Sequence, residues 1–407
     1  MPKVELANYQ GREQAYVKHC LLDGYLPDWA YKVGSTWDSL AYIDAFAGPW
    51  LTKHPNYADS SFGIAVDALR RCQNGLRESR GRDLHVECIL VEHDEEAFAH
   101  LEKFAARESG NNFVVRALPG KFATQIPTIE KLIKDSGRNP FRFVFLDPKG
   151  WADIPMEKLQ PLLRNRSCEV LITLMTRHIV RFLDQPDREN SYRKLFGRPG
   201  VIEVLRHTPP DERVERAVQE YSQSLRLLCG FKYVSSAVIL EPNEEAIRYY
   251  LMYATNHPRG VEVFKAAENK AARIQDTVRQ ESRIKKAGGQ LEFPTDDGPS
   301  RSRLVLELRQ RYMANARNKV MNVLVLKTIP EGVPYRDLFC EAMAFPLVNP
   351  DDLVDTVRAL APYVRINLAG SRRKKPSPLE DDRVVVLNRK GLQSLYSFSQ
   401  RSNQSPK

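Results

Sequence analysis

The sequence lacks the patterns that mark several common classes of protein. Its six cysteines include no C-x-x-C pair, which argues against a zinc site or a disulfide framework. No apolar run approaches the ~18 residues that span a membrane, and the N-terminus has no apolar signal region. Neither a P-loop, an H-E-x-x-H motif nor a nucleophile elbow occurs. We therefore expect a cytoplasmic protein with no membrane segment and no metal site.

Basic residues outnumber acidic ones. Lys and Arg number 61 and Asp and Glu number 51, so the formal charge is +10 over 407 residues. A basic excess favours a polyanionic partner. The excess is concentrated towards the C-terminus, where one loop carries Arg372, Arg373, Lys374 and Lys375. We expect these four residues to contact the phosphates of nucleic acid, with DNA favoured over RNA. The alternative is a solvated loop beside the acidic turn 380–382.

Short apolar runs alternate with helical segments in the first part of the chain. Two later apolar runs, 232–240 and 246–253, are separated by too few residues for a crossover helix, so we expect them to form an antiparallel pair. Nearly continuous apolar strands are typical of parallel sheets covered on both faces. The pattern predicts a doubly wound, Rossmann-like α/β sheet of seven strands with an antiparallel last pair, as in class I S-adenosylmethionine (SAM) methyltransferases. The first five strand candidates are Leu40–Phe46, His85–Glu92, Phe113–Leu118, Arg142–Asp147 and Cys168–Leu174.

The composition also predicts the domain boundaries. We expect the Rossmann-like domain over residues 1–287, with a helical insert at about 175–210. Residues 288–302 are rich in turn-forming residues and predict a linker. Residues 303–396 show helices and then two strands around the basic loop, which predicts a winged-helix-like nucleic-acid-binding domain. The polar segment 397–407 is expected to be a disordered tail.

Small residues follow the first strand candidate. Ligands of open α/β sheets lie beyond the carboxyl ends of the strands, where small residues let backbone N–H groups approach them. We predict that Asp44 holds the ammonium group of the SAM methionine, directly or through water. The alternative is an ordinary turn with a buried aspartate. The other cofactor contacts predicted in this segment are Phe46, Ala47, Gly48 and Pro49.

Acidic residues also end the second and fourth strand candidates. A carboxylate at the end of the second strand accepts hydrogen bonds from ribose hydroxyls, so we assign Glu92 and the adjacent His93 to the cofactor. The alternative is a solvated strand end. After the fourth strand, Asp147, Pro148 and Lys149 are the catalytic candidates. A carboxylate there would offset the charge that develops on an exocyclic amine during methylation. The alternative is that Asp147 caps the next helix.

One further motif follows the last strand candidate. It reads Asn256-His257-Pro258-Arg259-Gly260. We consider His257 a candidate for the border of the pocket, although a lone histidine in such a loop is more often structural.

Six segments together resemble the three-Cys-motif partner (TcmP) family of bacteria: YVKHCLLDGYL, YIDAFAGPW, SSFGIAVDAL, LVEHDEEAFAHL, FVFLDPKGW and TNHPRGVEVF. The resemblance implies a class I methyltransferase fold, SAM as cofactor and a radical-SAM-like partner protein. The chain departs from the family's usual pattern at Trp50, where a glycine is expected, and at Lys149, where Phe is usual.

These observations leave three hypotheses. In the first, the chain is a SAM-dependent methyltransferase that acts on an exocyclic amine of a nucleic-acid base. In the second, motivated by Trp50 and Lys149, it is a catalytically inactive DNA- or RNA-binding subunit of a bacterial multi-protein system, with phage defence as one such setting. A third assigns the C-terminal domain to protein contact instead of nucleic-acid binding.

Overall fold

The computed structural model describes most of the chain. Outside the described residues are Pro49 and Trp50, residue 287, residues 288–301 of the predicted linker and residues 403–407 of the predicted tail. The described ranges are 5–48, 52–54, 56–286, 302–327, 329–370 and 372–402.

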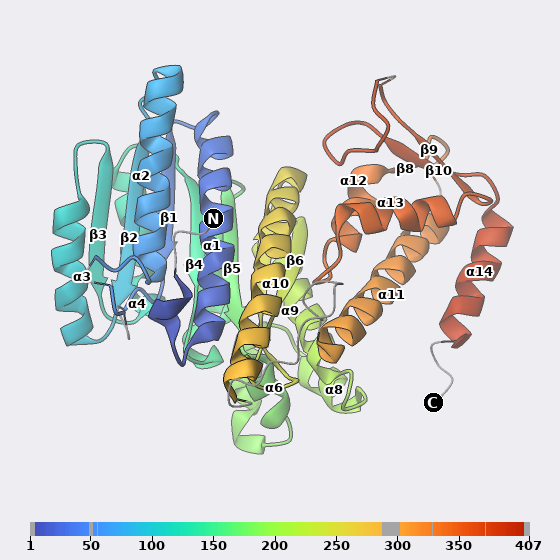
Figure 1. Ribbon diagram of the computed structural model, residues 1–407, viewed down its shortest axis with the longest axis horizontal. Helices are drawn as coiled ribbons and strands as arrows, with labels where there is room; N and C mark the ends of the chain where they lie inside the picture. Colours follow the sequence, from blue (N-terminus) through green and yellow to red (C-terminus); the bar gives the residue numbers. More distant parts are fainter. Residues whose placement is uncertain are drawn as a thin grey trace.

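A single large sheet organises the first part of the chain (Figure 1). Within the described residues it has seven strands in the order β3-β2-β1-β4-β5-β7-β6. The first five run parallel, and β7 is antiparallel to both of its neighbours. This order confirms the predicted doubly wound α/β fold with an antiparallel last pair. The strands are β1 Ser39–Asp44, β2 His85–Glu92, β3 Phe113–Pro119, β4 Phe141–Leu146, β5 Cys168–Leu174, β6 Tyr233–Leu240 and β7 Ile247–Thr255.

Helices cover both faces of this sheet. Alternation along β1 sends Tyr42 into one apolar layer and Ile43 into the other. The first layer contains the side chains of α1 Glu13–Gly34, α2 Ser61–Arg80, α3 Glu95–Glu108 and α10 Pro258–Lys286. The second contains those of α4 Phe122–Asp135, α5 Met156–Leu163 and α9 Arg213–Cys229.

Side-chain caps start two of the helices that follow strands. The Ser60 hydroxyl accepts a hydrogen bond from the Gly63 N–H at 3.1 Å and begins α2. Asp94 accepts one from the Ala97 N–H at 2.9 Å and begins α3. These caps fix the direction in which the chain leaves the carboxyl ends of β1 and β2.

Three short helices occupy the predicted insert: α6 Thr176–Arg181, α7 Glu189–Phe196 and α8 Val201–His207. They follow the carboxyl end of β5 and lie at the bottom of Figure 1. Trp151 in the loop after β4 packs against Tyr192 of α7, with ring centroids 5.3 Å apart. The insert therefore lies directly beside the loop that begins with Asp147.

The C-terminal part combines helices with a small antiparallel sheet of order β8-β10-β9. Helix α14 continues to Ser402, so the expectation of a disordered tail from residue 397 is wrong for its first six residues. An amphipathic pattern that includes the buried Leu392 extends the helix past the predicted boundary. The elements are α11 Arg303–Leu326, β8 Val333–Pro334, α12 Tyr335–Ala342, α13 Pro350–Ala359, β9 Val364–Asn367, β10 Arg383–Val386 and α14 Arg389–Ser402.

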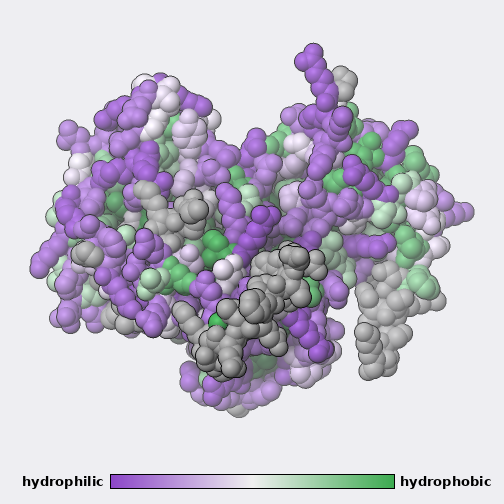
Figure 2. All heavy atoms as spheres, viewed as in Figure 1, coloured by the Kyte–Doolittle hydropathy of each residue, from purple (hydrophilic) through white to green (hydrophobic). Residues whose placement is uncertain are grey.

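A buried ion pair joins the two parts of the chain. Lys265 and Glu268 on α10 are bonded to each other and are at most 3% exposed. Lys265 also donates to the Phe345 carbonyl at 2.9 Å, and Glu268 accepts from the Leu347 N–H at 2.8 Å. The C-terminal part is thus docked on α10 by buried polar contacts. Hydrophilic side chains cover most of the face in Figure 2, and a notch separates the two parts at the top of that view.

Two kinds of feature are absent from the described residues. None of their helices combines the length and the apolar character that a membrane crossing requires. They also contain no group of three or more His, Cys, Asp or Glu side chains placed to hold a metal ion. All six cysteines are buried and free.

Candidate functional site

A cleft of about 660 Å³ opens at the carboxyl ends of the parallel strands. Its size is in the range of small-molecule and cofactor sites. Helix α1 forms one wall, and the loops after β1, β2, β3 and β4 form the rest. Of the residues predicted from the sequence, it brings together Phe46, Gly48, Glu92, His93, Asp147 and Lys149.

Asp44 is close to this cleft but does not line it. Its side chain is fully buried and accepts hydrogen bonds from the Ser61 hydroxyl at 2.7 Å, the Tyr42 hydroxyl at 3.2 Å and the Phe46 N–H at 3.2 Å. Burial raises the pKa of Asp44 to about 6, although these hydrogen bonds oppose the shift. The structure therefore corrects the direct form of the predicted cofactor contact and agrees with the alternative of a buried aspartate in the turn: Asp44 stabilises the loop after β1 from beneath.

Two other predicted residues also lie away from the cleft surface. Ala47 is fully buried, and its N–H donates to the Val91 carbonyl at 2.9 Å. Pro148 is buried and is not among the residues that line the cleft. Their part in the site is to hold the two loops in place.

Glu92 is held rigidly at the end of β2. Its Oε1 accepts hydrogen bonds from the N–H groups of His93 at 2.7 Å and Asp94 at 2.8 Å. The His93 Nδ1 lies 3.0 Å from the same oxygen. The Glu92 side chain is only 2% exposed yet borders the cleft. Backbone donors therefore fix one carboxylate oxygen, so the carboxyl group has one orientation towards the cavity.

Asp147 forms an ion pair with a residue that the sequence analysis missed. Lys18 on α1 binds Asp147 Oδ2, and the Thr173 hydroxyl donates to Oδ1 at 2.6 Å. Burial tends to raise the pKa of Asp147, but the Lys18 charge and the hydrogen bonds from Lys18 and Thr173 outweigh it. The pKa of Asp147 is therefore below its ordinary value. Asp147 is consequently a carboxylate at neutral pH, held between two donors.

His19 stands next to Lys18 on the same wall. Its Nδ1 lies 2.9 Å from the Tyr9 hydroxyl. Burial, with a further contribution from the Lys18 charge, lowers the pKa of His19 to about 3. His19 is therefore a neutral hydrogen-bonding side chain at the cleft. A lone Lys-His pair among apolar residues of a helix was the signal that could have pointed to this wall.

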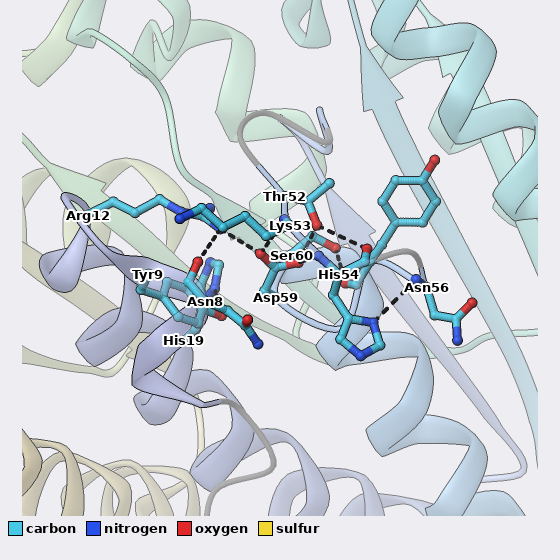
Figure 3. Close-up of polar contacts among 11 residues, drawn as sticks. Asn8, Tyr9, Arg12, His19, Thr52, Lys53, His54, Asn56, Asp59 and Ser60 are labelled. Carbon is cyan, nitrogen blue, oxygen red and sulfur yellow. Dashed lines mark hydrogen bonds and ion pairs between the residues drawn. The ribbon is translucent and has the colours of Figure 1, made fainter.

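Asp59, a carboxylate that the sequence analysis also missed, ties Arg12 at the start of α1 to the loop before α2 (Figure 3). It is 2% exposed and accepts from Arg12 at 2.5 Å, from the Lys53 N–H at 2.9 Å and from the Thr52 hydroxyl. These hydrogen bonds, together with that of the His54 N–H, outweigh burial and lower the pKa of Asp59. The Arg12–Asp59 pair thus fixes the rim of the cleft.

The loop after β3 supplies the far wall. Gly120 has φ +106°, a region that favours glycine, and the turn brings Lys121 and Phe122 to the cleft. The Phe122 ring lies 6.1 Å from that of Phe46 on the loop after β1. The pair gives this end of the cavity an apolar, aromatic surface beside the charged end at Asp147.

The motif at 256–260 is not part of this cleft. Because β7 is antiparallel, the loop that follows it lies at the opposite edge of the sheet. There the His257 Nδ1 accepts from the Arg259 N–H at 3.1 Å, and the Asn256 amide donates to the Arg166 carbonyl at 3.2 Å. The expectation that His257 borders the predicted pocket is therefore wrong.

The basic loop of the C-terminal part is only partly exposed. Arg373 turns back and makes two hydrogen bonds, of 2.8 and 2.9 Å, to the fully buried Asp382. Asp382 also accepts from the backbone N–H groups of Ala369 and Ser377, and Lys375 pairs with Asp351 at 2.7 Å. The predicted group of four cations is therefore divided. Arg373 shapes the loop, and Arg372, Lys374 and Lys375 are exposed.

No family model matches the chain, and no curated protein matches it. Among solved structures, the O-methyltransferase TomG of Streptomyces achromogenes, in complex with SAM, is 16% identical to it. That match covers 58% of this chain and 79% of TomG, with a TM-score of 0.32. An O-methyltransferase from Bacillus cereus, in complex with SAH, is 15% identical over 57% of this chain and 80% of that one, with a TM-score of 0.28. At this level of likeness, the fold class rests on the strand order of the chain itself.

Proposed function

We propose that the chain is a SAM-dependent methyltransferase. The observation that carries the proposal is the rigidly oriented Glu92 carboxylate in a cofactor-sized cleft above a sheet of order β3-β2-β1-β4-β5-β7-β6. A carboxylate at this place accepts hydrogen bonds from the ribose hydroxyls of a nucleotide cofactor.

The residues of the cleft fit such a cofactor in shape and charge. Gly48 and Gly120 let the backbone approach a ligand, and the Phe46–Phe122 pair offers an apolar surface to an adenine. Two of the cations that face the cavity, Arg12 and Lys18, are paired with carboxylates and so repel a sulfonium less. When bound, SAM supplies an electrophilic methyl group.

Asp147 is the group that would stabilise the reacting amine. Its low pKa keeps it anionic, and an anion at this place offsets the positive charge that a nitrogen gains as it accepts a methyl group. Lys18 is a positioning residue that holds the carboxylate through its ion pair. A substrate amine would have to bind beside Lys18 or take its place.

We infer that the substrate is nucleic acid, with DNA favoured over RNA and an exocyclic base amine as the target. Three observations support this proposal: the net charge of +10, the exposed Arg372 and Lys374, and a C-terminal part that combines helices with a small antiparallel sheet. The resemblance to the TcmP family adds a radical-SAM-like protein as a proposed partner.

Calorimetry with SAM tests the cofactor. The wild-type protein should bind SAM, and Glu92→Gln should weaken binding by about ten- to hundredfold, because a hydrogen bond to a charged group contributes about 1.5–3 kcal/mol. Glu96→Gln, at an exposed position on α3, is the matched control and should bind as the wild type does. A folded protein that fails to bind SAM would eliminate the proposal.

Transfer of tritiated methyl groups to cellular DNA and RNA tests the reaction. Asp147→Asn should lower the rate by two or more orders of magnitude while nucleic-acid binding stays unchanged. Nucleic-acid binding is tested by its salt dependence. In Arg372→Ala/Lys374→Ala, the slope of the logarithm of the binding constant against the logarithm of the salt concentration should be shallower by about 1.8. Lys103→Ala/Lys131→Ala, at exposed positions of the first part, should leave the slope as it is.

The Lys18–Asp147 pair also favours a second candidate, a subunit that binds nucleic acid without turnover. In that case, Asp147 is a structural partner of α1 and is not available to a substrate. The two candidates differ in one outcome: salt-dependent DNA binding combined with an absence of methyl transfer, in the presence of SAM, supports the subunit.

A further inference from the structure

A second pocket lies at the edge of the sheet opposite the cleft. Its volume is about 890 Å³. It is formed where α1 ends, where β4 and β5 begin and where the loop at 256–260 leaves β7. Six strand residues at ~3.3 Å each separate the two edges, so the pocket is about 20 Å from the cleft. The strand ends that form it are opposite the carboxyl end of β5, from which the chain continues into α6.

Aromatic rings form the inner wall of this pocket. Trp37 and Phe141 meet edge to face with centroids 5.4 Å apart, and Trp29 lies 6.2 Å from Phe141. Trp29 is 2% exposed, and its indole N–H has no hydrogen-bond partner among the described residues. A buried donor without a partner is costly, and a ligand acceptor would satisfy it. The wall thus suits a flat group that carries hydrogen-bond acceptors.

Cations stand at the rim. Arg80 lies over the Tyr31 ring at 5.4 Å, and Arg166 precedes β5. Both are exposed, and within the described part of the chain neither has a carboxylate within 4.0 Å. Two more basic residues of the rim, Lys32 and Arg259, have acidic neighbours on their own helices.

The carboxyl group of this pocket does not neutralise the positive charges of Arg80 and Arg166. Glu169 is the one carboxylic acid among the described lining residues. It accepts from Tyr25 at 2.5 Å and from Thr255 at 2.8 Å, and burial raises its pKa. A side chain at Gly260 would meet Glu169 Oε1 at 2.6 Å, so the loop needs glycine to pack here. Glu169 is therefore satisfied within the protein, and the pocket is left with a positive rim.

We propose that this pocket binds a nucleotide: a planar base against Trp29, Trp37 and Phe141, with its phosphate at Arg80 and Arg166. Arginine pairs with phosphate through two N–H groups, and stacking on aromatic side chains accepts any base. The nucleotide is either free or part of a single strand, which is the same chemistry from two sources. The proposal does not depend on methyl transfer, because it concerns residues at the other edge of the sheet.

Calorimetry with adenosine 5′-monophosphate (AMP) on the full chain tests this site. AMP should bind, and Arg80→Glu/Arg166→Glu should weaken it by tenfold or more, since the pair would then repel phosphate. Adenosine, which lacks the phosphate, should bind about tenfold more weakly than AMP to the wild type. Lys131→Glu/Lys134→Glu on α4 is the matched charge reversal and should change nothing.

The same experiment must distinguish AMP binding in the pocket from AMP binding in the cleft. Glu92→Gln should leave AMP binding unchanged if the pocket is the site. AMP binding that is lost in Glu92→Gln and kept in the Arg80→Glu/Arg166→Glu variant overturns the proposal, as does an absence of binding at millimolar AMP. Competition by an oligodeoxyadenylate identifies a strand as the source, and its failure to compete identifies a free nucleotide.

Discussion

Replacing Lys18 by methionine should destabilise the protein by about 2–3 kcal/mol at neutral pH. The side chains of Lys18 and Asp147 are 9% and 25% exposed, so the burial of their ion pair is intermediate between that of buried and of exposed ion pairs. Removing one partner of a buried pair costs about 3–5 kcal/mol, whereas exposed pairs contribute about 0–1 kcal/mol. The loss arises because the Asp147 carboxylate keeps only its hydrogen bond from Thr173.

The pH dependence of this loss has a definite sign. In the wild type, the pKa of Asp147 is lower in the folded state, so the pair stabilises the fold above the ordinary aspartate pKa of 3.8 and less as the pH falls. In Lys18→Met, burial acts without the neighbouring cation and raises the pKa of Asp147. The difference in stability should therefore be largest at neutral pH and should shrink towards about pH 4.

Urea denaturation at both pH values measures the effect, and two further variants make it specific. Lys149→Met changes an exposed lysine of the same cleft and should cost less than about 0.5 kcal/mol. Lys18→Met/Asp147→Asn removes both charges and should recover most of the loss. A Lys18→Met variant that is as stable as the Lys149→Met control, or whose loss of stability grows as the pH falls, would refute this role of the ion pair.

Asp44, Lys265 and Asp382 are buried charged groups, and replacing each should have a measurable effect. The pKa of Asp44 is about 6 in the folded protein, against an ordinary value of 3.8. Ionisation of Asp44 should therefore lower the free energy of unfolding of the wild type by up to about 3 kcal/mol between about pH 4 and pH 7. Urea denaturation of Asp44→Asn should not show this loss. Lys265→Met should cost about 3–5 kcal/mol in thermal or urea melts, and Lys265→Met/Glu268→Met should recover part of it; equal stability of the two variants would contradict a paired role. Asp382→Asn should release Arg373, so the amide protons of the loop should exchange faster with D₂O while those of the large sheet keep their rates.

Most of the sheet could be predicted from the sequence because its strands are apolar on both faces. The apolar run 40–46 predicts β1 with an error of one residue at the start and two at the end. The agreement is close because a strand that is buried on both faces is a continuous apolar run. The same feature explains why the sequence left two alternatives open for Asp44. An acidic residue at the end of a buried strand predicts a carboxylate near the cleft but not whether it points into the cavity or into the loop beneath.

The sequence pattern does not predict the wall formed by α1, for a different reason. Helical periodicity predicts which residues are buried, and Lys18 and His19 fall among buried positions. Whether those positions face the sheet or a cavity depends on how α1 crosses the carboxyl edge, which is a tertiary property. A lysine at a buried position nevertheless requires an anionic partner, and Asp147 was available as a candidate from the fourth strand.

The direction of the last strands decides where each loop can act. An antiparallel β7 could be inferred from the short connection after β6, and it places the carboxyl end of β7 beside the amino ends of β4 and β5. Residues after β1, β2 and β4 therefore meet at one edge, and Thr255 to Gly260 meet Glu169 and the aromatic wall at the other. Two loops that both resemble binding motifs thus cannot share one ligand. Either each serves its own site or one is structural, and the AMP experiment with Glu92→Gln and the double arginine variant separates these cases.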